Sequence, residues 1–175
     1  MWAGAASPKP GPANWGLGMA TFVGSYENKV DAKGRVSVPA RFRDEIREQS
    51  YQGIVVSPSA DPGAIDACDY LRLTDVSAAL DDPDLYTQDE RLRAERIIAR
   101  STLLPFDENG RVMLPQSLIG QAGIEGMALF TGIGPTFQIW HPERRAAFEA
   151  ETLDRDQAAG ASLRLLPKVR RPSTS

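Results

Sequence analysis

The 175-residue sequence predicts an α+β protein, mainly β, built from two tandem hairpin modules with short helices. Three observations support this fold class. A ten-residue segment occurs twice without a gap, both copies carry the turn sequence Asp-x-x-Gly-Arg, and both end in a proline that can open a short helix. Apolar residues flank each turn, as is typical of a β-hairpin.

The two ends of the chain differ from this pattern. Residues 1–18 are rich in Gly, Pro and Ala without helical or strand periodicity, so we expect a disordered N-terminal tail. Residues 152–175 are expected to form the end of a helix and then a basic tail. The modules are assigned to residues 22–80 and 101–151, joined by a linking helix within residues 81–100.

Each repeat is expected to form a tight turn. The first runs Val-Asp-Ala-Lys-Gly-Arg-Val-Ser-Val-Pro over residues 30–39, and the second runs Phe-Asp-Glu-Asn-Gly-Arg-Val-Met-Leu-Pro over residues 106–115. The side chain of Asp31 or Asp107 can accept hydrogen bonds from following backbone N–H groups. Gly34 or Gly110 can adopt a positive φ, which a tight turn requires.

The alternation Arg-Val-Ser-Val after the first turn indicates a half-buried strand, and a helix is expected at residues 40–47. Further strands are expected at residues 53–56 and 127–131. In the first copy, a short strand at residues 71–73 should lead into a helix at residues 75–80. In the second copy, a strand at residues 137–140 should likewise lead into a helix at residues 142–148. The extra residues of the first copy are expected in a loop at residues 57–69. Residues 85–99 are expected to form the linking helix.

The composition excludes several classes of protein. No run reaches the roughly 18 apolar residues that a membrane-spanning helix needs, and no secretory signal is visible, so we expect a cytoplasmic protein without membrane contact. The single cysteine, Cys68, permits no internal disulfide and no zinc framework. The single histidine, His141, is interpreted as a capping or surface residue. We find no catalytic motif and expect no enzyme, cofactor or metal site.

Charge is distributed unevenly along the chain. The net charge is -3, yet residues 28–47 hold six basic and three acidic side chains, whereas residues 61–90 hold nine acidic ones and only Arg72. Any contact with DNA must therefore come from a local cluster. Lys33, Arg41 and Arg43 are candidates for phosphate contacts, and the alternative for each is a solvated surface charge.

The paired Asp and Arg of each turn have two interpretations. Asp31 can pin its hairpin by pairing with Arg35, and Asp107 can do the same with Arg111. Alternatively, the carboxylate orients the arginine toward phosphate or the O6/N7 edge of guanine. Both interpretations can hold together. The first hairpin is the better candidate for facing DNA, because the second has Glu and Asn where the first has Ala and Lys.

The two turn sequences and the run Val-Ser-Val-Pro resemble the MraZ family of bacterial transcriptional regulators, tandem relatives of AbrB-type swapped-hairpin proteins. The resemblance covers residues 22–151. It implies a pseudo-two-fold swapped-hairpin β-barrel and a ring-like homo-oligomer. It also implies binding to double-stranded DNA with tandem direct repeats upstream of a division and cell-wall gene cluster, in the nucleoid. Arg35 and Arg111 would take part in DNA recognition.

A second hypothesis belongs to another functional class. An antitoxin-like protein-interaction or assembly module would use the hairpins only to dimerise. Its acidic segment, residues 61–90, would then hold a basic partner.

Overall fold

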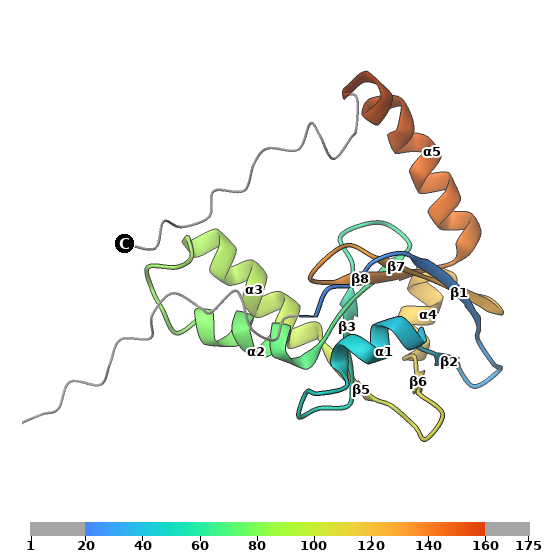
Figure 1. The fold of residues 1–175 in the computed structure, drawn as a ribbon. Helices are drawn as coiled ribbons and strands as arrows, with labels where there is room; N and C mark the ends of the chain where they lie inside the picture. Colours follow the sequence, from blue (N-terminus) through green and yellow to red (C-terminus); the bar gives the residue numbers. More distant parts are fainter. Residues whose placement is uncertain (1–19, 160–175) are drawn as a thin grey trace, which may run out of the picture.

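The computed structural model describes residues 20–159 and is shown in Figure 1. The predicted N-terminal tail and residues 160–175 of the C-terminal tail lie outside this range. The first copy comprises β1 (Ser25–Lys29), β2 (Arg35–Ser37), α1 (Ala40–Ile46), β3 (Gly53–Pro58), β4 (Ala64–Cys68) and α2 (Tyr70–Ala79). The helix α3 (Gln88–Arg100) follows. The second copy comprises β5 (Thr102–Pro105), β6 (Arg111–Met113), α4 (Gln116–Ala122), β7 (Met127–Gly132), β8 (Phe137–Trp140) and α5 (Pro142–Ala159).

The two copies exchange strands. A six-stranded sheet has the order β1-β7-β8-β4-β3-β5, and β2 pairs with β6 in a separate two-stranded ribbon. Every pairing is antiparallel. The first strand of each copy therefore lies against the other copy, β1 on β7 and β5 on β3. Interchanging the copies reproduces the same strand order, which places a pseudo-two-fold axis between β4 and β8.

The predicted fold class is confirmed as a mixed helix and sheet architecture with a mainly antiparallel sheet. Hydrogen bonding does not close the sheet into a barrel: within residues 20–159, β1 and β5 remain its two edges. An isolated bridge between Val30 and Val36 joins the end of β1 to β2. The closed barrel therefore stays a prediction.

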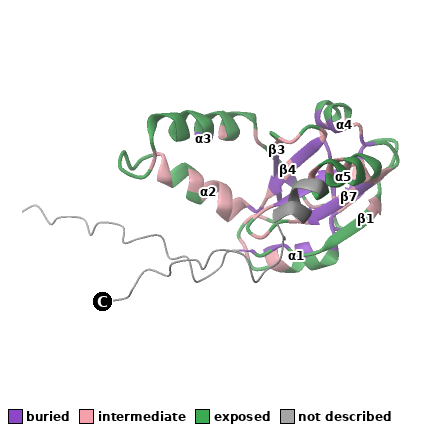
Figure 2. Cartoon of the chain, turned by 90° about the horizontal axis from the view of Figure 1, so that it is seen from above, coloured by how far each residue is buried: buried purple, intermediate pink, exposed green. Residues whose placement is uncertain are grey.

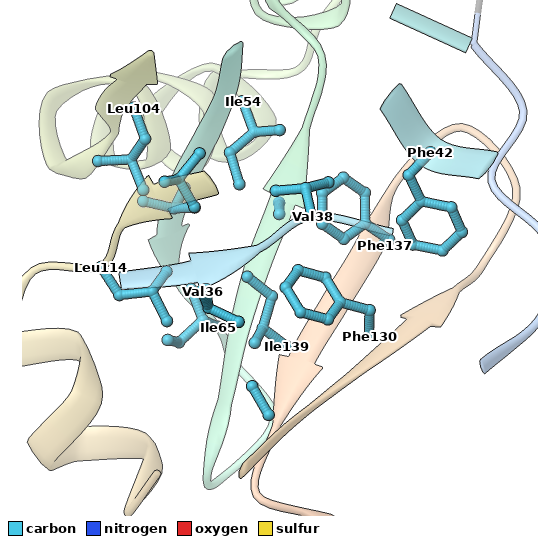
Figure 3. Close-up of a cluster of buried hydrophobic side chains, with 14 of the residues drawn as sticks. Val36, Val38, Phe42, Ile54, Ile65, Leu104, Leu114, Phe130, Phe137 and Ile139 are labelled. Atoms are coloured by element: carbon cyan, nitrogen blue, oxygen red, sulfur yellow. The ribbon is translucent and has the colours of Figure 1, made fainter. Parts of the chain in front are cut away.

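The hydrophobic core lies between the six-stranded sheet and the β2–β6 ribbon (Figure 3). Val36 and Val38 are buried from one copy, and Val112 and Leu114 are buried from the other. The alternating pattern after each turn therefore predicted the inward face correctly. Aromatic rings of Phe22, Phe42 and Phe137 pack with centroids 4.8–5.2 Å apart at one end of this core. In Figure 2 the buried residues concentrate in the sheet, while α3 is largely exposed.

The prediction for residues 57–80 was partly wrong. Residues 71–73 belong to α2 and form no strand, and the strand that precedes the helix is β4, inside the segment expected to be a loop. The Asp69 carboxylate accepts a hydrogen bond of 2.7 Å from the Arg72 backbone N–H, so Asp69 caps the helix and starts it at Tyr70. The small alanines of β4 hid its alternating pattern.

The linking helix begins at Gln88 rather than at residue 85, because Thr87 and Glu90 form a capping box. The Thr87 N–H donates to the Glu90 carboxylate at 2.8 Å. Figure 1 shows α2 and α3 side by side, away from α5. No helix within the described residues is long and apolar enough to span a membrane.

Candidate nucleic-acid interface

The first turn is organised by the side chain of Asp31. Its Oδ1 accepts hydrogen bonds from the backbone N–H groups of Lys33 and Arg35, both at 2.9 Å. Its Oδ2 accepts from the Nε of Arg35 at 2.6 Å. Gly34 has a φ of 83° and donates its N–H to the Asp31 carbonyl oxygen at 2.9 Å. One carboxylate thus fixes both the backbone of the turn and the direction of the arginine.

The second turn repeats this arrangement. Oδ1 of Asp107 accepts from the backbone N–H groups of Asn109 and Arg111 at 2.9 Å, and its Oδ2 accepts from the Arg111 Nε at 2.8 Å. Gly110 has a φ of 69° and donates to the Asp107 carbonyl oxygen at 3.0 Å. The predicted turn geometry and the Asp–Arg pairs are therefore present in both copies.

These hydrogen bonds stabilise the charged carboxylates. The backbone N–H of Arg35 is the main cause that lowers the pKa of Asp31, and the Arg35 side chain adds to it. The backbone N–H of Arg111 likewise lowers the pKa of Asp107. Both aspartates therefore stay ionised at neutral pH and remain hydrogen-bonded to the arginines.

The two arginines lie on one face of the β2–β6 ribbon. Arg35 is paired with Met113, and Ser37 is paired with Arg111, across the central pair of Val36 and Val112. Because neighbouring residues of a strand point to opposite faces, the buried valines place these four side chains on the outer face. Side chains of Arg35 and Arg111 are 37% and 33% exposed, and Met113 is 57% exposed. Arg35 and Arg111 are diagonal neighbours across the two strands, an arrangement in which residues are typically about 7–8 Å apart.

This face can recognise an anion or a base edge. Each Asp–Arg hydrogen bond uses the Nε, and among the described residues the terminal Nη groups of Arg35 and Arg111 have no hydrogen-bond partner. A guanidinium presents these donors in a planar fork that suits phosphate and the O6/N7 edge of guanine. The ribbon therefore offers two oriented forks, one from each copy.

The basic cluster of residues 28–47 is divided by the fold. Lys33 is exposed at the tip of the first turn, and Arg41 is exposed on α1. Arg43 is half-buried and lies against Gly110 of the second turn, not against the first. Positive charges that are close in sequence are therefore separated in the structure, with Lys33 on the first turn and Arg43 against the second.

Sequence reasoning missed three residues of this region. Ser37 and Met113 complete the outer face of the ribbon, and the alternating pattern could have indicated them. Asn28 donates from its Nδ2 to the Ser37 carbonyl oxygen at 2.7 Å, which ties β1 to β2. No local pattern predicts this contact, because it depends on the tertiary path of the chain.

The remaining candidate residues have structural roles. His141 accepts a hydrogen bond on Nδ1 from the Glu143 backbone N–H at 3.3 Å, so it caps the start of α5 as expected. Burial raises the pKa of the half-buried Cys68 thiol to about 12. Within residues 20–159, no group of three or more potential ligands could hold a metal ion.

Two similar hairpin units that exchange strands, each with an arginine oriented by an aspartate, define a protein built by internal duplication. A family model described as "MraZ protein, putative antitoxin-like" matches residues 21–57 and 97–166. The chain belongs to the MraZ family.

Curated relatives agree with this assignment. A protein of Rhodospirillum rubrum named "Transcriptional regulator MraZ" is 48% identical over 128 residues, covering 71% of this chain and 81% of the relative. One of the same name from Pelagibacter ubique is 41% identical over 73% of this chain and 81% of its own length. Another from Gluconobacter oxydans is 34% identical over 90% of this chain and 93% of its own length. The prediction of a transcription regulator rather than an enzyme is confirmed at the level of this family.

Proposed function

We propose that the protein regulates transcription by binding double-stranded DNA that carries tandem repeats, with the β2–β6 ribbon placed in the major groove. The major groove is about 12 Å wide and admits a two-stranded β-ribbon. The names of the curated relatives support regulation of transcription. The outer face of the ribbon supports DNA as the ligand.

The observation that carries this proposal is the matched pair of arginines. Arg35 and Arg111 come from different copies, yet each is held by an aspartate four residues earlier and each lies on the same face. An exposed ion pair contributes little to stability, so stability alone gives little reason for two such pairs. As oriented forks, the same arginines can contact guanine or phosphate.

Exposed cations would complete the interface. In this proposal the exposed Lys33 of the first turn and the exposed Arg41 of α1 contact phosphates, which would position the protein on the duplex without reading its sequence. The second turn has Asn109 at the position of Lys33, next to the acidic Glu108. The first turn therefore contributes more of the electrostatic attraction.

One protomer offers few such contacts, and we propose that a ring-like homo-oligomer supplies more. Linking several ribbons raises the effective concentration of each later contact to about the millimolar range when the spacing of the DNA repeats matches. In this proposal the ribbon also completes a pseudo-two-fold swapped-hairpin β-barrel, with modules at residues 22–80 and 101–151. The DNA repeats would lie upstream of a division and cell-wall gene cluster. The protein would be located in the cytoplasm, in association with the nucleoid.

Fluorescence anisotropy with labelled DNA carrying tandem repeats tests the proposal. We expect the variants R35A and R111A each to lower affinity by about 5- to 150-fold, because a bidentate arginine contact contributes about 1–3 kcal/mol. R96A is the matched control, since Arg96 is an exposed arginine on α3, away from the ribbon. Equal losses in all three variants, or no binding by the wild-type protein at low salt, would contradict the proposal.

A second candidate function is an antitoxin-like interaction module. The description of the matching family favours it, and the acidic side chains of Asp81, Asp82 and Asp84 are exposed before α3. Such a module would hold a basic protein partner. Co-purification of a stoichiometric basic partner, together with no retardation of DNA, would favour this function over DNA binding.

A further inference from the structure

Arg43 belongs to the first copy in sequence but contacts the turn of the second copy. Its Nε donates to the Val38 carbonyl oxygen at 3.1 Å, and the Val38 N–H donates to the Gly110 carbonyl oxygen at 3.1 Å. A Cβ added to Gly110 would lie 2.6 Å from the Arg43 Cζ. The guanidinium therefore packs directly on the backbone of Gly110.

The equivalent place in the other half of the molecule has a different side chain. The Leu114 N–H donates to the Gly34 carbonyl oxygen at 2.9 Å, as Val38 does to Gly110. Ile119, which corresponds to Arg43 in the repeat, packs against Gly34 instead. The backbone interaction is the same in both halves, but the supporting group is apolar under one turn and cationic under the other.

The cation matches the charge of the turn that it supports. Arg43 lines a pocket of about 320 Å³ together with Asp44, Arg47, Asp107 and Glu108. The second turn carries two acidic side chains and Arg111, whereas the first carries one acidic side chain with Lys33 and Arg35. A guanidinium under the second turn offsets the repulsion between the acidic side chains of that turn and so favours its folded geometry.

We propose that Arg43 is a positioning residue that holds the second turn in its DNA-facing geometry, and that it does not itself contact phosphate. This inference rests on the proposed function, although its first test needs no DNA. It replaces the sequence-based interpretation of Arg43 as a phosphate contact. Arg41, two residues earlier and exposed, keeps that role.

Amide hydrogen exchange of the free protein tests the positioning role. In R43A the Val38 and Gly110 amides should exchange faster, on the order of tenfold. Without the guanidinium, the backbone hydrogen bonds of the second turn should open more often. The Leu114 amide reports the equivalent bond under Gly34 and should be unchanged. If R43A folds poorly, R43K replaces it in this experiment, and the same faster exchange is expected. Lysine keeps the positive charge but cannot place a planar guanidinium on Gly110.

The salt dependence of DNA affinity separates positioning from phosphate contact. R41A should reduce the slope of log K against log salt by about 0.9, the value for one lost phosphate contact. R43A should weaken binding without changing this slope. A slope change of about 0.9 in R43A, or unchanged exchange at Val38 and Gly110, would overturn the inference. If wild-type protein binds no DNA, the proposed function fails, whereas the exchange result still decides whether Arg43 holds the turn.

Discussion

Val36 and Val112 face each other at the centre of the β2–β6 ribbon, and both side chains are buried. They are equivalent residues of the two copies, so the pseudo-two-fold axis of the ribbon passes between them. Both are flanked by outward-facing side chains, including Arg35 and Arg111. The packing of two valines therefore sets the relative placement of the two arginine forks.

Truncation of this pair should cost stability. We expect V36A and V112A each to lower the free energy of unfolding by about 2 kcal/mol, because each removes buried methyl groups and leaves a cavity. Urea denaturation of both single variants and the double variant measures this. The loss of unfolding free energy in the double variant should differ from the sum of the losses in the single variants, since the two valines are directly paired. Strict additivity would show that the valines do not interact.

The turn aspartates should make stability dependent on acid pH. The folded state lowers the pKa of Asp31 below its usual 3.8, so the stability that its charge contributes is present above that value. This contribution is lost as the pH falls through the lowered pKa of the folded state. D31N should therefore be less stable than wild type above about pH 5, with a difference that shrinks below pH 4.

Thermal unfolding of D31N, D107N and wild type between pH 2 and 7 measures this effect. Asp107 should behave in the same way, because the cause of its lowered pKa is the equivalent backbone hydrogen bond. D89N is a control at an exposed aspartate near the start of α3. A stability difference that is independent of pH would exclude the charge of the turn aspartates as its source.

The tips of the turns should control the salt dependence of DNA binding. E108A combined with N109K gives the second turn the tip residues of the first, Ala32 and Lys33. Affinity should rise, and the salt slope should steepen by about 0.9 if the new lysine contacts one phosphate. K33N should have the opposite effect.

Anisotropy titrations at several salt concentrations provide these slopes. E125K raises the net charge by the same amount at an exposed position outside the turns and serves as the control for net charge. If E125K raises affinity as much as the double change at residues 108 and 109, net charge rather than the turn would explain the result.

Cys68 should be an unreactive thiol in the folded protein. Burial raises its pKa to about 12, and the thiolate is the nucleophilic form. Reaction with a disulfide reagent at pH 8 should be slow in the native state and fast in denaturant. Fast native labelling would mean that this part of the sheet opens readily.

Much of each hairpin could be predicted because its causes are local. The spacing from Asp31 to Arg35 determines the side-chain hydrogen bonds, and Gly34 permits the positive φ. The same holds for residues 107–111. The alternation after each turn predicted which residues enter the core, since strand geometry sends successive side chains to opposite faces.

The exchange of strands could not be predicted in the same way from local pattern. The sequence of β1, Ser-Tyr-Glu-Asn-Lys, would be equally compatible with pairing inside its own copy. The expectation of interlocking hairpins came only from a family resemblance. The contact of Arg43 with Gly110 depends on that exchange, because it joins a helix of one copy to a turn of the other. The strand expected at residues 71–73 was wrong because the Asp69 cap outweighed a short apolar pattern.

The pairing of β1 with β7 and of β5 with β3 has a consequence for how the chain comes apart. Opening either half removes an outer strand from the other, so neither half retains a complete sheet by itself. We therefore expect the duplicated chain to unfold in one cooperative step. We also expect the two fragments produced by a proteolytic cut in the exposed segment before α3 to remain associated.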